Sequence, residues 1–234
     1  MNATAERMAL DDVAVVIPAL NEADSLPLVL SAMPSVGHVI VVDNGSTDDT
    51  PGVARAGGAV VVHEPRRGYG QACQAGIREA VSRAASVVVI LDADHSFDPQ
   101  EIAALTAPIL RDEADMVLGD RTERAEKGAI TPQQRIGNRV ATFLIRRITG
   151  HRYSDMGPFR AIRTQALVDM AMEDPNFGWN VEMQIKAVRH GLRVMEMPVR
   201  CRVRQAGDSK ISGSVRGSVR AGWKMMRAAG RYAR

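Results

Sequence analysis

Two carboxylates separated by a single residue follow a strongly apolar segment near the middle of the chain. The residues Val87–Leu91 are all aliphatic, and Asp92 and Asp94 come directly after them. A short β-branched run predicts a buried strand of a parallel sheet, and its carboxyl end is the edge at which open α/β sheets bind ligands. Two neighbouring carboxylates repel each other unless a cation lies between them, and Mg²⁺ and Mn²⁺ prefer such oxygen ligands. We therefore predict that Asp92 and Asp94 hold a divalent metal ion against a phosphate-bearing substrate; capping of the next helix is the alternative.

Three further predicted strands of the first half also end in polar or small residues. In a parallel sheet, these ends lie on the same edge as Asp92. The carboxylates of Glu22 and Asp43 can accept hydrogen bonds from a nucleobase or a ribose, and Gly68 and Gly70 allow close backbone approach to a phosphate. A simple turn followed by a helix cap is the alternative for any one segment, and the convergence of all four disfavours it. The three segments are Pro18–Glu22, Asp43–Asp48 and Glu64–Gly70.

The elements that must position these residues alternate along the first half of the chain. One helix has a clear start, with Asp98 as its N-cap, Pro99 at the first helical position and Glu101 as the partner acid. The order of strands and helices predicts an α/β fold, with a mainly parallel sheet between two layers of helices. The predicted strands span residues 13–17, 39–42, 59–63, 87–91 and 116–118, and the predicted helices span residues 25–33, 48–56, 71–84 and 99–110.

The second half of the chain is predicted to contain amphipathic helices and two more strands. Residues 133–149 and 181–190 predict helices, and residues 159–162 and 194–199 predict strands. A final helix is predicted from about Ser214, with a basic stripe beside its apolar stripe. In the helix over residues 133–149, the apolar residues expected on one side are Ile136, Val140, Phe143, Leu144 and Ile148, and the arginines expected around the rest are Arg135, Arg139, Arg146 and Arg147.

The composition bounds the class of protein. The chain has 234 residues, of which 45% are hydrophobic and 4% aromatic, and this suits one α/β domain. No apolar run reaches the roughly 18 residues that span a bilayer, and the first ten residues lack the apolar core of a secretory signal. Cys73 and Cys201 lack the spacing of metal ligands. We therefore expect reduced, structural thiols in a cytoplasmic protein.

Basic residues are concentrated toward the end of the chain, although the formal net charge is only +3. From Arg200 onward, ten Arg and Lys residues stand against the single acid Asp208. This asymmetry predicts an anionic partner. Nucleic acid is disfavoured, because stacking aromatic residues are not interleaved with the basic ones. The predicted final helix suits an anionic membrane surface, and packing of its apolar stripe on the domain is the alternative.

Three other classes of nucleotide-binding protein fit the sequence poorly. Gly68-Tyr69-Gly70 lacks the third glycine of the dinucleotide-binding motif and follows the third predicted strand instead of the first. The chain also has no Gly-x-x-x-x-Gly-Lys-Ser/Thr loop. A sugar nucleotidyltransferase would need a glycine-rich basic loop after the first strand, where this chain has Pro-Ala-Leu-Asn-Glu.

The ordered set of motifs resembles that of family 2 glycosyltransferases with the GT-A fold. Motifs of the second half further resemble the dolichyl- and polyprenyl-phosphate sugar synthase branch. The resemblance covers about residues 13–215 and implies one GT-A domain over residues 1–234. Its nucleotide-sugar half would span about 12–130, its acceptor half about 131–211, and its basic C-terminal helix about 212–234. The motifs of the first half are Val16–Glu22, Val41–Asp48, Arg67–Gly70 and Leu91–Asp94, and those of the second half are Gly119–Arg121, Gln134–Asn138, Asp155–Arg160 and Arg204–Lys210.

The resemblance implies a role for each matching residue. Asp92 and Asp94 would hold Mg²⁺ or Mn²⁺ against the diphosphate of a UDP- or GDP-linked sugar. Ser96 and Pro158 depart from the pattern of the branch, so the identities of sugar and acceptor stay open. The residues that would line the nucleotide-sugar pocket are Pro18, Leu20, Glu22, Asp43, Gly68, Asp92 and Ala93. Those that would gather the acceptor and the leaving diphosphate are Arg121, Arg135, Arg202, Arg204 and Lys210.

The chemistry of the acceptor decides whether the reaction needs a general base. A polyprenyl phosphate is already ionised at neutral pH, because its second pKa is about 6; it needs arginines to place it. A hydroxyl acceptor needs a base, for which Asp155 is the candidate. The several arginines favour a lipid phosphate, with inversion at the sugar and peripheral association at the inner face of the plasma membrane. A soluble transferase that acts on a hydroxyl is the first alternative, and a non-catalytic sugar-nucleotide-binding protein is the second.

Overall fold

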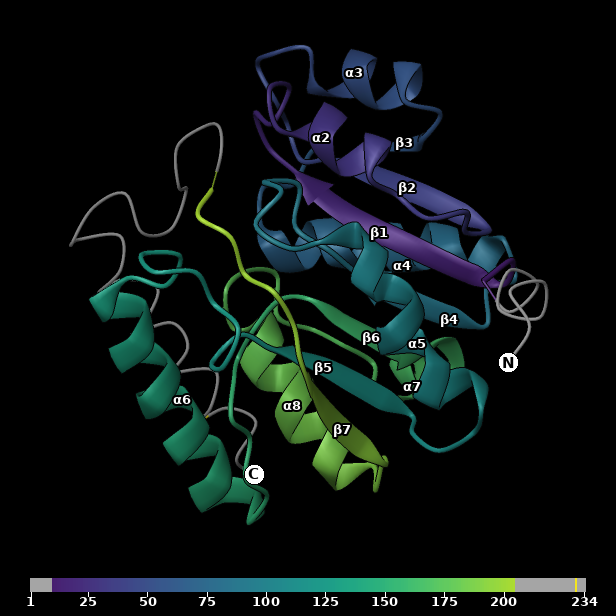
Figure 1. Ribbon diagram of the computed structural model, residues 1–234. Helices are drawn as coiled ribbons and strands as arrows, with labels where there is room; N and C mark the ends of the chain where they lie inside the picture. Colours follow the sequence, from purple (N-terminus) through teal and green to yellow (C-terminus); the bar gives the residue numbers. More distant parts are fainter. Residues whose placement is uncertain (1–9, 205–229, 231–234) are drawn as a thin grey trace.

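The strands pair in one sheet of seven, in the order β3-β2-β1-β4-β6-β5-β7, within the residues that the structure describes (Figure 1). The computed structural model describes residues 10–204 and Gly230. Every pairing is parallel except those of β6, which runs antiparallel to both β4 and β5. The predicted mainly parallel α/β architecture is therefore confirmed. The strands are β1 (Val13–Ala19), β2 (His38–Asp43), β3 (Val60–His63), β4 (Val87–Ile90), β5 (Met116–Asp120), β6 (Arg160–Arg163) and β7 (Val194–Pro198).

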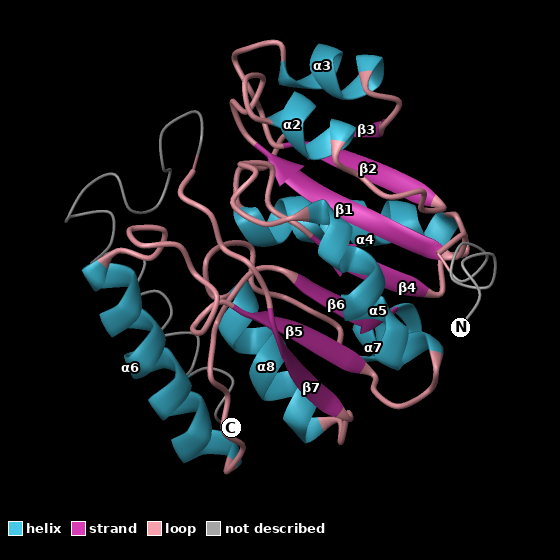
Figure 2. Ribbon diagram, viewed as in Figure 1, coloured by secondary structure: helices cyan, strands magenta, loops and turns pink. Residues whose placement is uncertain are grey.

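Helices cover both faces of the sheet (Figure 2). Side chains of α2, α3 and α5 share one apolar core with the sheet, and those of α4, α6, α7 and α8 share the other. Val13 and Val15 enter the first core while Ala14 and Val16 enter the second, so both faces of β1 are buried and its sequence is continuously apolar. The helices are α2 (Leu26–Ser31), α3 (Thr50–Ala56), α4 (Tyr69–Ser82), η1 (Pro99–Glu101), α5 (Ile102–Leu110), α6 (Pro132–Thr149), α7 (Thr164–Asp169) and α8 (Trp179–Arg189).

The predicted N-cap Asp98 is confirmed, and two other local features differ from the prediction. Asp98 caps the 3₁₀ turn η1 that leads into α5, by accepting a hydrogen bond from the N–H of Gln100. Glu101 does not complete that cap, because its carboxylate instead accepts hydrogen bonds from the N–H of Arg200 and the guanidinium of Arg124. The helix α7 was not predicted, because six residues are too few to establish a helical period.

The apolar residues of the helix α6 lie on two faces, although the sequence pattern predicts them on one side. Ala141 and Ile145 are buried, and Leu144 and Ile148 pack beside them. Their spacing of i, i+3, i+4 and i+7 defines the core-facing stripe. The other three residues of the predicted stripe are exposed, namely Ile136 (63%), Val140 (43%) and Phe143 (60%). The predicted single apolar side therefore consists of two faces.

Some predicted features lie outside the described residues. These are the final helix, Lys210 and the chain before Leu10. Among the helices of residues 10–204, none combines the length and apolarity needed to traverse a bilayer.

Candidate active site

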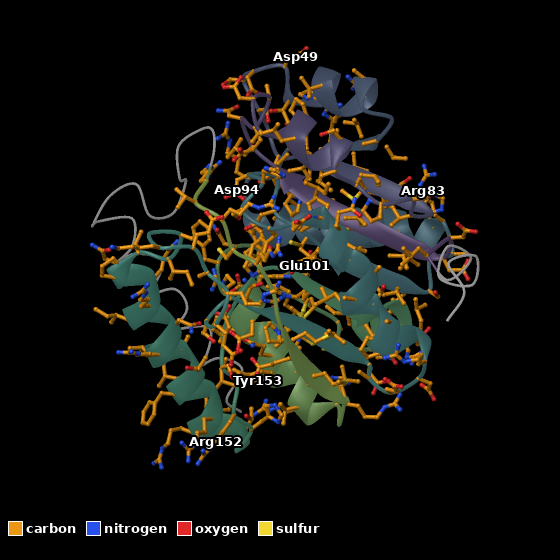
Figure 3. The ribbon with its side chains drawn as sticks, in the orientation of Figure 1. Asp49, Arg83, Asp94, Glu101, Arg152 and Tyr153 are labelled. Atoms are coloured by element: carbon orange, nitrogen blue, oxygen red, sulfur yellow. The ribbon has the colours of Figure 1, made fainter. Side chains whose placement is uncertain are left out.

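Carboxylates from three strand ends meet at one edge of the sheet. Asp92 and Asp94 follow β4, Glu22 follows β1, and Asp43 is the last residue of β2. The parallel pairing of β1 with β2 and with β4 places these ends side by side. Asp94 lies at the edge toward which the arrowhead of β1 points (Figures 2 and 3). The strand ends therefore converge as the sequence predicts.

The two carboxylates after β4 have different surroundings. Burial, together with the neighbouring charge of Asp94, raises the pKa of Asp92 to about 7, although Arg121 acts in the opposite direction. Asp94 is oriented by Ser96, whose N–H and hydroxyl donate to Oδ1 at 3.0 Å and 2.5 Å. The departure from the family pattern at Ser96 thus supplies a clamp for Asp94. The surroundings favour a cation between the two acids, because two neighbouring negative charges that are both partly buried are costly.

The donor set fits a divalent ion that is shared with a substrate. Among the described residues, no group of three or more His, Cys, Asp or Glu side chains is placed to hold a metal. Asp92 and Asp94 therefore offer two carboxylates but not a complete cage. Mg²⁺ takes one or two protein carboxylates and completes its shell with phosphate oxygens and water. The site thus fits Mg²⁺ or Mn²⁺ held jointly by these acids and a diphosphate.

Arg204 reaches across this edge and joins two of its acids. Its Nη2 donates a hydrogen bond to Oε1 of Glu22, and its Nη1 lies 3.7 Å from Oδ2 of Asp94. Glu22 is 8% exposed and is fixed by Ser25, whose hydroxyl donates to Oε2 at 2.7 Å. The N–H of Glu22 also donates to the hydroxyl of Thr50 at 2.8 Å. The guanidinium of Arg204 therefore supplies positive charge at the place where the predicted metal site lies.

The chain segment that carries Arg204 is fastened beside the carboxylates. The N–H of Arg202 donates to the carbonyl of Ser96 at 2.8 Å, and its Nη2 donates to Oδ2 of Asp98 at 2.6 Å. The backbone of Cys201 pairs with that of Phe97 and that of Ala125 as isolated β-bridges in the same region. Arg202 and Arg204 are thus brought to the predicted metal-binding edge. The contact of Arg202 with His95 there joins residues that are 107 positions apart in sequence.

Arg121 and Asp155 form a buried, two-bonded ion pair next to Asp92. Nε of Arg121 donates to Oδ2 of Asp155 at 2.7 Å, and Nη2 donates to Oδ1 at 2.8 Å. The N–H groups of Arg121 and Met156 also donate to this carboxylate. Burial alone would raise the pKa of Asp155, but these hydrogen bonds and the charge of Arg121 lower the pKa below its usual range. Asp155 is therefore ionised, and its oxygens are committed to Arg121 and the backbone.

Two residues outside the predicted site residues hold this pair in place, and a glycine leaves room for it. The carboxylate of Glu196, on β7, accepts hydrogen bonds from the N–H groups of Ser154 and Asp155. Asn138, on α6, donates to the carbonyl of Ser154 at 3.1 Å and accepts from the N–H of Met156 at 2.8 Å. At Gly157, an added Cβ would lie 2.9 Å from Oδ2 of Asp155. Asn138 is the last residue of the Gln134–Asn138 motif, and this motif is the sequence signal that could identify it.

The nucleotide side of the site is ordered around Asp43 and Asn44. Oδ1 of Asp43 accepts a hydrogen bond from the N–H of Ser46, and Oδ2 lies 3.1 Å from Nδ1 of His63. Asn44 donates to the carbonyls of Glu64 and Arg66, and its Oδ1 accepts from the N–H of Gly68 at 2.8 Å. Asn44 is not among the predicted site residues; its place directly after a strand-end aspartate is the available signal.

The glycines after β3 are crowded by protein backbone. Gly68 has φ of +151°, and a Cβ there would lie 2.2 Å from the carbonyl oxygen of Pro175. A Cβ at Gly70 would lie 1.9 Å from the carbonyl oxygen of Asp174. The N–H of Gln71 donates to the carbonyl of Pro175 at 3.1 Å. The absence of a side chain at these glycines thus allows the loop before α8 to pack closely against the start of α4.

The remaining predicted residues are placed less tightly. Pro18 pairs with Val42 in the sheet, and Ala93 is buried between the two aspartates. Leu20 is partly buried at the same edge. Arg135 is exposed near the start of α6, where its N–H donates a hydrogen bond to the carbonyl of Thr131 at 3.0 Å. Its predicted part in acceptor binding stays a prediction.

Comparisons with known proteins place the chain in a family. Residues 14–170 match the family described as Glycosyl transferase family 2. An uncharacterized glycosyltransferase of Mycobacterium tuberculosis is 42% identical over 215 residues, which cover 91% of this chain and 95% of that protein. An undecaprenyl-phosphate mannosyltransferase of Micrococcus luteus is 34% identical over 220 residues, which cover 88% of this chain and 89% of that protein. Glucosyl-3-phosphoglycerate synthase from Mycobacterium tuberculosis, solved with Mn²⁺, UDP and phosphoglyceric acid, matches with a TM-score of 0.77 at 21% identity over 99% of this chain and 82% of that one. The chain therefore has a GT-A-like fold and belongs to glycosyl transferase family 2, so it is a glycosyltransferase.

Proposed function

We propose that this glycosyltransferase moves a sugar, with inversion, from a nucleoside diphosphate to a polyprenyl phosphate at a membrane surface. The related undecaprenyl-phosphate mannosyltransferase supports this class of acceptor. The observation that carries the proposal is the Arg121–Asp155 pair beside Asp92. A site that commits its buried carboxylate to holding an arginine suits an acceptor that is already an anion.

The donor side of the proposal rests on the acids of the sheet edge. Asp92 and Asp94 would hold Mg²⁺ or Mn²⁺, and this ion would neutralise the diphosphate as it leaves. Glu22 and Asp43 lie on the neighbouring strand ends, where a nucleoside would bind. Arg204 would turn from Glu22 and Asp94 toward the diphosphate once the ion is bound. UDP and GDP donors both fit these groups.

The acceptor side of the proposal rests on Arg121. Its side chain is 17% exposed, and its guanidinium is oriented by both oxygens of Asp155. An arginine that is fixed in this way can place a phosphate without loss of side-chain freedom during the reaction. The phosphate oxygen then attacks the sugar from the face opposite the leaving diphosphate, and no proton has to be removed.

Transfer to a hydroxyl is the competing function. It requires Asp155 to accept a proton from the acceptor, yet the described contacts of Asp155 leave neither oxygen free. Its lowered pKa also makes it a weak base. These observations support Asp155 as a positioning residue.

The deciding experiment measures the release of nucleoside diphosphate from a panel of UDP- and GDP-linked sugars. Each donor is tested with Mg²⁺, Mn²⁺ or EDTA, and with or without a short-chain polyprenyl phosphate. We expect release from one donor that requires both the metal and the lipid phosphate. Release that the lipid phosphate does not stimulate, but that glycans or hydroxylated metabolites do, would overturn the proposed acceptor. The Asp94→Asn variant is the control for contaminating hydrolases.

A further inference from the structure

The outer face of α6 carries an apolar stripe that no described residue covers. Ile136, Val140 and Phe143 are spaced i, i+4 and i+7, so they lie on one side of the helix. Their exposed fractions are 63%, 43% and 60%. The buried residues Ala141 and Ile145 lie on the opposite side, so α6 is held to the domain without this stripe. Figure 1 shows α6 as the outermost helix on its side of the molecule.

The charge around this stripe has one sign. Arg135, Arg139 and Arg146 follow one another along one flank of the stripe, and Arg147 continues the stripe toward the C-terminal end of the helix. All four are exposed. The helix Pro132–Thr149 contains no Asp or Glu. An exposed apolar stripe beside a row of cations is complementary to the acyl boundary and the anionic headgroups of a bilayer.

The helix is also tied directly to the acceptor side of the site. Asn138, on the inner side of α6, binds the carbonyl of Ser154 and the N–H of Met156, which flank Asp155. Asp155 in turn orients Arg121. A surface that seats α6 would therefore hold Arg121 at a fixed position relative to that surface. We infer that the outer face of α6, defined by Ile136, Val140, Phe143, Arg139, Arg146 and Arg147, docks the enzyme on an anionic membrane.

This inference rests on the proposed lipid acceptor, and the charges favour a bilayer over a second copy of the chain. Pairing two copies through α6 would bring two rows of arginines together without any carboxylate on the helix. Three exposed apolar residues also offer little of the roughly 800 Å² per partner that a stable protein interface buries. An anionic bilayer offers an apolar interior for the stripe and negatively charged headgroups for the arginines.

The test is flotation of the full chain with vesicles. One set contains phosphatidylcholine alone and the other contains phosphatidylcholine with phosphatidylglycerol. We expect binding to the anionic set, which weakens as salt is raised. The Ile136→Ser/Phe143→Ser variant should lose about tenfold or more of this binding. The Arg139→Gln/Arg146→Gln variant should lose the preference for phosphatidylglycerol. Matched controls are Val81→Ser and Val168→Ser, which alter apolar residues that are 44% and 49% exposed on other helices.

Further readouts separate this inference from its rivals and from the proposed function. Unchanged vesicle binding by the stripe variant would overturn the inference. A shift of wild-type dimer to monomer in that variant would assign the stripe to a second copy. A large drop in melting temperature with unchanged vesicle binding would assign it to packing within the chain. Turnover with a water-soluble, short-chain polyprenyl phosphate should stay near wild type. Absence of that turnover in the wild-type enzyme would instead overturn the proposed function, whatever the vesicles show.

Discussion

At the scale of single residues, the site is a balance between acids that need a cation and arginines that supply one. Asp92 and Asp94 repel each other when both are ionised, and burial makes the ionised form of Asp92 still less favourable. Arg204 offsets part of this cost from the side of Glu22 and Asp94. Binding of a divalent ion therefore competes with both a proton on Asp92 and the guanidinium of Arg204.

The competition with the proton predicts how metal affinity depends on pH. Because the pKa of Asp92 is raised to about 7, most of Asp92 is protonated at lower pH in the metal-free protein, and an ion must displace that proton. We expect the affinity for Mn²⁺ to rise as the pH rises from about 5.5 and to level off above about 7. Isothermal titration calorimetry across this range measures it. In the Asp92→Asn variant, the binding should be weak and nearly independent of pH; an equally steep pH dependence in that variant would rule out Asp92 as the titrating ligand.

The competition with Arg204 predicts an unusual gain of function. Replacing Arg204 with Gln removes the cation that bridges Glu22 and Asp94. We expect Mn²⁺ to bind several-fold more tightly in the absence of nucleotide, because the two acids then lack a partner. Turnover should fall, because the same guanidinium is proposed to bind the leaving diphosphate. Arg200→Gln is the matched control on the same segment, and weaker Mn²⁺ binding by Arg204→Gln would contradict this account.

The Arg121–Asp155 pair predicts the behaviour of a positioning residue. Asp155→Asn removes the negative charge but keeps the size of the side chain. Breaking a buried ion pair costs about 3 kcal/mol of stability. Because Arg121 then loses its fixed orientation, we expect turnover to fall on the order of 100-fold and the acceptor KM to rise. The pH profile of the remaining activity should keep its shape. Loss of its acidic limb would instead identify Asp155 as a general base. Melting temperatures of both proteins show whether the fold survives.

At the scale of elements, the site depends on loops that are clamped by helices and strands far away in sequence. The loop before α8 presses on the first turn of α4 at Gly68 and Gly70. Glu182, inside α8, holds that loop by accepting hydrogen bonds from the N–H groups of Glu173 and Asp174. The turn after β3 is therefore shaped by α8 as well as by its own sequence.

This packing predicts opposite effects for two glycine substitutions. A Cβ at Gly70 would lie 1.9 Å from the carbonyl oxygen of Asp174, so Gly70→Ala should displace the loop and cost about 2 kcal/mol of stability. Gly137, in α6, has nothing within 4 Å of an added Cβ. Gly137→Ala should therefore stabilise the protein by up to about 1 kcal/mol, because alanine favours the helix. Thermal unfolding of the two variants compares them directly, and equal melting temperatures would contradict the assigned crowding.

At the scale of the whole molecule, the hydrophobic pattern of the sequence predicts those parts of the fold that depend mainly on local sequence. The strands that lie between two helical layers are continuously apolar, so β1, β2 and β4 could be predicted with the acids at their ends. The reversal of β6 between β4 and β5 could not, because strand direction depends on tertiary packing. The pairing of Arg121 with Asp155 spans 34 residues and that of Arg204 with Glu22 spans 182, and no spacing rule reports such contacts. The predicted single apolar side of α6 likewise divides into a core-facing and an exposed stripe, since periodicity alone does not say which apolar residues meet the core.

The assembled site lies where the two halves of the sheet join, and this predicts how ligands stabilise the molecule. Glu22 and Asp94 come from the strand ends of β1 and β4, whereas Arg204 comes from the chain beyond β7. A metal ion and the cognate nucleoside diphosphate would link the same parts. At a ligand concentration of 100 times Kd, binding adds about 2.7 kcal/mol, which raises the melting temperature by roughly 5–10 °C in a protein of this size. We expect this shift with Mn²⁺ and one of UDP or GDP together, a smaller shift with either component alone, and no added effect of Mn²⁺ in the Asp94→Ala variant. Equal shifts with nucleotide in EDTA would show that the nucleotide binds without a metal at Asp92 and Asp94.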